Sequence, residues 1–145
     1  MSNQTLHFTT TINAPVATVR DIMLSHPTYE ERTKAFSEGS TYIGSWDQGS
    51  EIKFVGPSGQ GGMLAMIAHN TLHEYLSIKH LGEIGADGHI TKHEYESFEN
   101  YRFITINDNT TQLDIEMTAM PNERVDMFND MWPKALKLLK ELCEQ

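Results

Sequence analysis

The seven histidines of this sequence are the side chains best suited to chemistry, because imidazole exchanges protons near neutral pH. In EYLSIKHLGEI the apolar alternation runs through Leu76 and Ile78 to His80, so His80 should point to the buried face of a strand. Two interpretations follow. His80 is either a core histidine satisfied by one backbone or hydroxyl partner, or a polar anchor in an apolar pocket.

As an anchor, His80 could orient a ligand carboxyl or hydroxyl. It could also serve as a general acid or base, with a tyrosine such as Tyr101 for proton transfer. No Ser–His–Asp order or nucleophile elbow is visible, and the PSGQGG segment at Pro57–Gly62 lacks the lysine and following helix of a phosphate loop. An enzyme is therefore an alternative, and no catalytic residue is assigned.

Two histidine pairs have a spacing that invites a metal interpretation, His69 with His73 and His89 with His93. The first pair spans a predicted turn, and His89 lies in a predicted loop. No cysteine partner and no HExxH helix accompany them. We expect neither a metal site nor a cofactor.

The bulk composition favours one compact domain. The chain has 145 residues, of which 39% are hydrophobic and 21% charged. The net charge of -9, without a basic cluster, argues against nucleic acid and anionic membranes as partners. No secretory signal or membrane span is visible, and the single Cys143 suits a reducing compartment. We expect a cytoplasmic protein.

Changes in the spacing of apolar residues predict the strands and helices that would position these side chains. A strand is predicted at Gln4–Ile12, then a helix capped by Asn13 or Ala14 with Pro15 in its first turn, and a second short helix at Thr28–Ala35. About six strands follow, and in the last one Leu113, Ile115, Met117 and Ala119 share one face. The acids of HEYESFEN are expected on a solvated strand face. A long helix at Glu123–Glu144 completes an α+β fold.

Proline interrupts that last helix at Pro133, directly after Trp132. Proline inside a helix removes a donor and bends the axis, which would free the Asn129 carbonyl. We expect the first half to stand away from the sheet while the second half packs tightly, leaving a cavity between sheet and helix. The alternative is a bend that merely follows the curve of the sheet, with no void.

Four segments together resemble a known superfamily: INAPVATVRDIM, GSWDQGSEIKF, AHNTLHEYLSIKHLGEI and MWPKALKLLKEL. Their order and spacing are similar to START-like domains of the SRPBCC superfamily, which have the birch-pollen-allergen-like, helix-grip fold. Within it, the chain looks like the branch related to the activator of the heat-shock protein ATPase. The resemblance covers essentially the whole chain. It implies a curved antiparallel sheet of about seven strands, in β-α-α-β6-α order, wrapped around a long C-terminal helix.

The resemblance also implies binding of an apolar small molecule, lipid-like or polycyclic, between sheet and helix. Candidate lining residues, chosen by strand alternation and helix face, are Phe54, Met66, Ile78, His80, Met117, Phe128, Met131 and Trp132. The alternatives are an enzyme on the same cavity, using His80 for acid–base chemistry, and a chaperone-associated interaction module without a cavity. We expect at most a weak homodimer.

Overall fold

The computed structural model describes residues 4–32, 39–56, 61–120 and 122–144. Its elements follow the predicted order of one strand, two short helices, six strands and one long helix. They are β1 Gln4–Ile12, α1 Val16–Leu24, α2 His26–Arg32, β2 Thr41–Gly44, β3 Glu51–Val55, β4 Gly62–Thr71, β5 Tyr75–Ile84, β6 Ile90–Asn107, β7 Thr110–Met120 and α3 Asn122–Cys143. The predicted α+β class and element order are confirmed.

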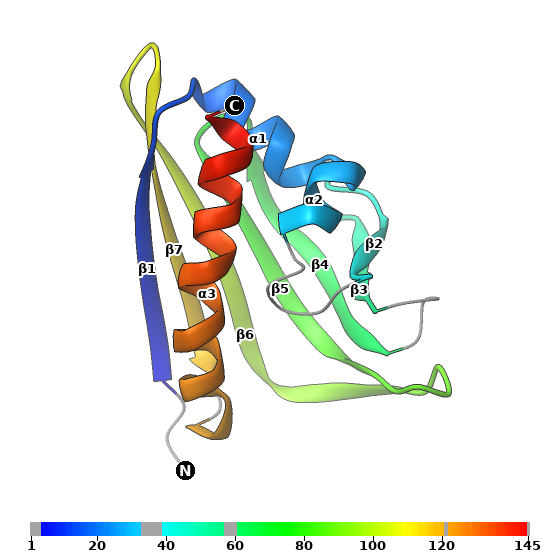
Figure 1. Ribbon diagram of the computed structural model, residues 1–145. Helices are drawn as coiled ribbons and strands as arrows, with labels where there is room; N and C mark the ends of the chain where they lie inside the picture. Colours follow the sequence, from blue (N-terminus) through cyan, green and yellow to red (C-terminus); the bar gives the residue numbers. More distant parts are fainter. Residues whose placement is uncertain (1–3, 33–38, 57–60, 121, 145) are drawn as a thin grey trace.

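The described strands form one antiparallel sheet of seven, in the order β1-β7-β6-β5-β4-β3-β2. Only the pair β1 and β7 joins strands that are distant in sequence, so α1 and α2 cross from one edge of the sheet to the other (Figure 1). All three helices lie over the same face of the sheet, which we call the inner face. The opposite face is the outer face. This arrangement is the helix-grip architecture.

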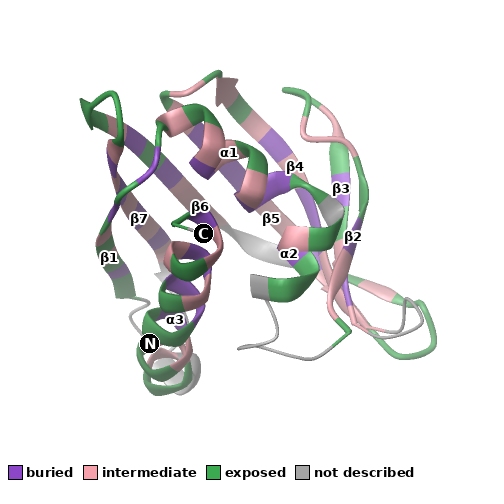
Figure 2. Ribbon diagram, turned by 45° about the horizontal axis from the view of Figure 1, so that its top comes forward, coloured by how far each residue is buried: buried purple, intermediate pink, exposed green. Residues whose placement is uncertain are grey.

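Strict alternation of apolar and polar residues explains why one face is buried. Along β7, Leu113, Ile115 and Met117 are buried, whereas the side chains between them are partly exposed. The core lies between the inner face and the helices, where Trp132, Leu136 and Leu139 of α3 contribute to it (Figure 2). The predicted facing of these three β7 residues is confirmed, while the side chain of Ala119 lies outside the described residues.

The helix boundaries correct two expectations. Pro15 is itself the N-cap residue of α1, in extended conformation and without a side-chain cap, because the fixed φ of proline suits a helix entrance. Asn13 and Ala14 therefore precede the cap. The second helix begins at His26 rather than Thr28, since Pro27 fits its first turn. Its predicted end at Ala35 lies outside the described residues.

Helix α3 runs without interruption through Pro133 (Figure 1). Pro133 is exposed, while the preceding Trp132 is buried. A missing backbone donor costs least on the side that faces water, so this placement explains how the helix tolerates a proline. The backbone of α3 comes closest to β1, α1 and α2. The helix is continuous across Pro133. The bend of its axis stays a prediction.

Candidate functional site

A polar cluster of Glu99, His80 and Tyr101 lies on the inner face of the sheet. His80 Nε2 is 3.2 Å from Glu99 Oε1, and the Tyr101 hydroxyl donates a hydrogen bond to Glu99 Oε2. The three residues come from β5 and β6, which pair side by side. Each oxygen of one carboxylate is thus held by a different proton-exchanging side chain. The sequence pointed to His80 and Tyr101, and the structure connects them through Glu99.

Glu99 lies on the inner face, whereas the sequence predicts the acids of HEYESFEN on a solvated strand face. Its side chain is only 17% exposed and that of His80 only 12%, so the expectation of a solvated face is wrong here. The cause is register: Glu99 lies opposite Ile78 on β5 and Met117 on β7, both of which are buried. The spacing from Glu99 to the aromatic Tyr101 and Phe103 was the signal that could have revealed this.

Aromatic rings extend from this cluster in both directions along the inner face. On one side Tyr101 contacts Trp132 of α3, with ring centroids 6.2 Å apart, and Trp132 stacks on Phe8 of β1 at 5.8 Å. On the other side His80 lies 6.4 Å from Phe54 of β3. The carboxyl group of Glu99 is therefore set within a largely aromatic and aliphatic wall, which is the pattern of a specific polar contact in an apolar site.

A second aromatic group continues from Phe54 toward the far edge of the sheet. Phe54 lies 5.7 Å from Trp46 and 6.2 Å from Tyr29, and Tyr29 meets Tyr42 edge to face at 5.1 Å. The Tyr42 hydroxyl donates to the Leu24 carbonyl at the end of α1, which fixes one helix to this edge. Rings at these separations interact favourably beyond the area they bury. This group forms an aromatic cluster beside His80.

The pairing of β5 and β6 becomes irregular directly beside the cluster. His80 pairs with Ser97, yet Gly82, two residues later, pairs with Lys92. The ladder loses its register directly after His80, and β6 changes direction there (Figure 1). Such irregularities re-aim side chains and are common next to functional sites.

Two buried nitrogen atoms near Phe54 have no hydrogen-bond partner within the described part of the chain, His80 Nδ1 and Trp46 Nε1. The backbone of Trp46 is held, because its carbonyl accepts a 2.7 Å hydrogen bond from Asn70. Leaving a buried polar atom unsatisfied costs free energy, so native structures seldom do it without a reason. His80 thus satisfies one ring nitrogen through a carboxylate, and its other ring nitrogen has no partner among the described residues.

Several predicted lining residues surround Glu99. Ile78 and Met117 flank it on the neighbouring strands, Phe54 contacts His80, and Trp132 contacts Tyr101. Phe128 is a partly buried residue packed against the core. Met131, just before Trp132, is half-buried.

Met66 lies elsewhere. It pairs with Glu51 on β3 and Lys79 on β5, while its neighbours Ala65 and Ile67 are fully buried. Opposite residues in a ladder share a face, so Met66 is on the outer face and does not join the other candidates. A bulge between Ile67 and His69 interrupts the alternation along β4, and one extra residue reverses the face of every position beyond it.

The remaining histidines form no comparable cluster in the residues that the structure describes. His69 Nε2 contacts the hydroxyl of Thr71 at 2.9 Å, and His73 occupies a turn with φ of 64°. No three His, Cys, Asp or Glu side chains of the described chain come together as metal ligands. The side chain of His93 lies outside the described residues.

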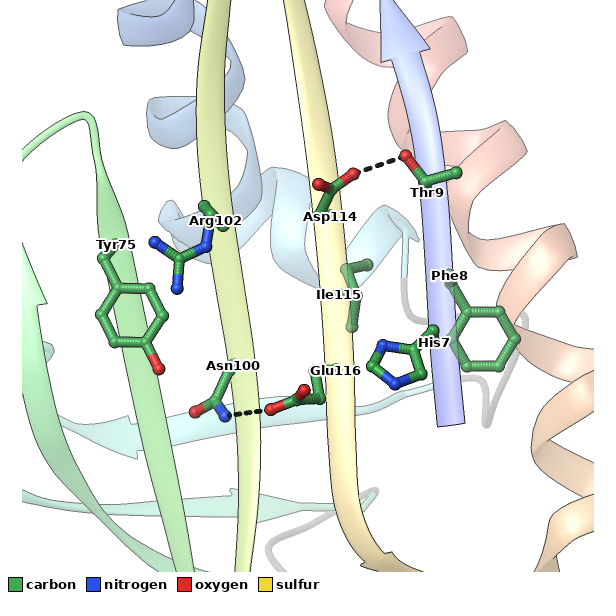
Figure 3. A pocket seen from close by; sticks show the side chains of 9 residues that line it. All are labelled: His7, Phe8, Thr9, Tyr75, Asn100, Arg102, Asp114, Ile115 and Glu116. Atoms are coloured by element: carbon green, nitrogen blue, oxygen red, sulfur yellow. Dashed lines mark hydrogen bonds between the residues drawn. The ribbon is translucent and has the colours of Figure 1, made fainter. Parts of the chain in front are cut away.

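The outer face carries an open groove of about 390 Å³ between β1, β7, β6 and β5 (Figure 3). Its polar side chains satisfy one another: Thr9 donates to Asp114 at 2.6 Å and Asn100 donates to Glu116 at 3.1 Å. Arg102 lies over the ring of Tyr75, 4.8 Å from its centroid. Such pairs are typical of the solvated face of a sheet.

One seven-stranded sheet, a long helix across its inner face and a polar cluster beneath that helix define a helix-grip protein. The structural neighbours of this chain are SRPBCC and Aha1-domain-like proteins. No protein-family model matches the sequence, and no curated protein matches it. At the low identities given below, the likeness establishes the fold.

Three neighbours illustrate the likeness. The Aha1 dimer from Colwellia psychrerythraea is 15% identical, with a TM-score of 0.74 over 97% of this chain and 96% of the other. Protein CV1439 from Chromobacterium violaceum is 15% identical, with a TM-score of 0.72 over 98% and 99%. CalU16 from Micromonospora echinospora is 15% identical, with a TM-score of 0.69 over 97% of this chain and 76% of that one. Within the described residues, no helix is both long and apolar enough to cross a membrane.

Proposed function

We propose that this protein binds an apolar small molecule between the inner face of its sheet and α3. The single observation that carries the proposal is the Glu99 cluster: a carboxylate held by His80 and Tyr101 on an apolar, aromatic wall. Polar groups are expensive to bury, and an aliphatic side chain at position 99 would pack more cheaply between Ile78 and Met117. A bound molecule that uses these groups gives them a purpose.

The aromatic surroundings support the same conclusion. Rings from β1, β3, β6 and α3 lie on both sides of Glu99, and planar or polycyclic ligands stack favourably on such rings. The outer groove is the weaker candidate, because it is open and its polar groups already pair with one another. Small-molecule sites are usually concave and mostly apolar, with only a few polar groups.

Native mass spectrometry of the protein purified from its own cells tests this proposal. We expect a co-purifying small molecule that is lost in Phe54→Ala and retained in Tyr75→Ala. These variants form a matched pair, since each removes one ring, the first on the inner face and the second in the outer groove. Retention by Phe54→Ala together with loss from Tyr75→Ala would move the site to the outer face. Absence of any bound molecule would contradict the proposal.

A second candidate, an enzyme using the same site, is favoured by the bridge from His80 to Tyr101. A carboxylate that fixes a histidine tautomer is how many enzymes hold a general base. The recovered molecule, incubated with fresh protein, would distinguish the two functions. Conversion by the unaltered protein but not by Glu99→Gln would establish catalysis, and an unchanged molecule in both would exclude it for that ligand.

A further inference from the structure

We infer that the ligand of the inner site presents a neutral hydroxyl group to His80 Nδ1. This inference rests on the proposed function and names the chemical class of its ligand. It starts from the hydrogen-bond inventory of the cluster. An ionised carboxylate only accepts, so the contact between Glu99 and His80 requires His80 Nε2 to carry the hydrogen. In the neutral imidazole, Nδ1 then has a free lone pair and accepts.

The position of Nδ1 makes that lone pair significant. It is buried, and no donor within the described chain reaches it. A hydroxyl is a small group that can donate to this nitrogen without carrying charge into the site. The Tyr101 hydroxyl does not serve, because it already donates to the other oxygen of Glu99.

Charge disfavours the commonest alternative, a ligand carboxylate. Such a group at Nδ1 would meet a lone pair rather than a donor. It would also lie across one imidazole ring from the Glu99 carboxylate, within a wall of apolar side chains. Two like charges held close together in a poorly solvated site repel strongly. Fatty acids and other carboxylates should therefore bind weakly.

The aromatic rings of Phe54 and Trp46, beside His80, indicate a second feature of the ligand. Phe54 lies between His80 and Trp46, and Trp46 Nε1 is a buried donor without an acceptor in the described residues. A ligand that extends from His80 over Phe54 would bring an oxygen acceptor within reach of that donor. The expected class is therefore a neutral, hydroxylated aromatic or polycyclic compound.

Isothermal titration calorimetry with three naphthalenes at pH 8 tests the inference. The probes share one ring system: 2-naphthol carries a hydroxyl, 2-methoxynaphthalene blocks it, and 2-naphthoate replaces it with a carboxylate. We expect 2-naphthol to bind about tenfold more tightly than 2-methoxynaphthalene, the ratio typical of one hydrogen bond to a buried group. The carboxylate should bind most weakly.

Two variants locate the effect. His80→Phe keeps a ring but removes both nitrogens, so the preference for 2-naphthol should fall to near equality. Tyr101→Phe removes the other donor to Glu99 and leaves Nδ1 in place, so it should retain the preference. Circular dichroism verifies that both fold, and the ranking on the unaltered protein stands even if one does not.

The outcomes separate the two proposals. Binding of all three probes without a preference for 2-naphthol, or with 2-naphthoate tightest, overturns the hydroxyl inference and leaves the inner site standing. A preference that survives in His80→Phe overturns the role of Nδ1. If none of the probes binds, both the inference and the proposed aromatic ligand site fail together.

Discussion

The two faces of the sheet carry similar polar side chains in opposite settings. On the outer face, Asp114 and Glu116 accept hydrogen bonds from Thr9 and Asn100 in an open groove. On the inner face, Glu99 accepts from two side chains beneath a helix, between buried aliphatic neighbours. Water reaches the partners on the open outer face, whereas on the inner face the side chains of His80 and Glu99 are only 12% and 17% exposed. The same residue type therefore indicates solubility in one place and a site in the other.

The largest contrast between the faces should appear in packing. Leu113 is fully buried on the inner face, and Gln112 beside it projects to the outer face. Leu113→Ala should lower the free energy of unfolding by about 2–5 kcal/mol, because it leaves a cavity. Gln112→Ala should change it by less than about 0.5 kcal/mol. Urea denaturation of both variants measures the difference, and equal losses would show that the two faces are not distinct.

The next contrast concerns two glutamates. In Glu99→Gln the amide oxygen can still accept one hydrogen bond, but the amide nitrogen then meets a second donor, so one buried partner loses its acceptor. We expect a loss of about 1–3 kcal/mol in the free energy of unfolding. Glu116→Gln, on the outer face, is the control and should lose less than about 1 kcal/mol. A Glu99→Gln protein as stable as the unaltered one would refute the bridge.

The smallest effect lies at the end of α3, outside both faces. Hydrogen bonds from the Lys140 side chain and the Asn13 backbone lower the pKa of Glu144 from its ordinary 4.5. A lowered folded pKa stabilises the protein above the unfolded value, and this contribution disappears as the pH falls through the folded value. The stability difference between unaltered protein and Glu144→Gln should therefore be small at pH 7 and smaller still at pH 3.

Urea midpoints at these two pH values provide the measurement for Glu144. Glu141→Gln, on the same helix, serves as the control for removing one acid from this surface. A difference for Glu144→Gln that grows as the pH falls would contradict the lowered pKa. The comparison separates a solvated ion pair from the enclosed Glu99 cluster, whose loss should be larger at neutral pH.

The hydrophobic periodicity of the sequence was enough to predict most of the helices and strands. Gln4–Ile12 is a strand with the predicted bounds, and the predicted helix at Glu123–Glu144 differs from α3 by one residue at each end. These elements are long and strongly periodic, so neighbouring residues alone determine which side is buried. β6 begins at Ile90, where its early residues pair with β5 although their sequence shows little alternation.

Only some of the residues of the inner-face site could be predicted from the sequence. Alternation placed His80 inward, because Leu76 and Ile78 precede it without interruption, and the structure confirms that position. Alternation failed for Met66, since a bulge in β4 is set by how that strand meets β5 and leaves no mark in composition. The spacing of apolar residues along the last helix placed Trp132 on its apolar face. Its contact with Tyr101, however, depends on where α3 crosses the sheet.

The sequence by itself determined the order of elements, the class of fold and the inward direction of His80, because each depends on residues close together in the chain. Only the tertiary structure decided that Glu99 is the partner of His80 and Tyr101. That choice depends on the register between β5 and β6, in which Ile78 lies opposite Glu99 and His80 opposite Ser97. Register is a property of two strands at once, and a shift of one residue would turn Glu99 toward water.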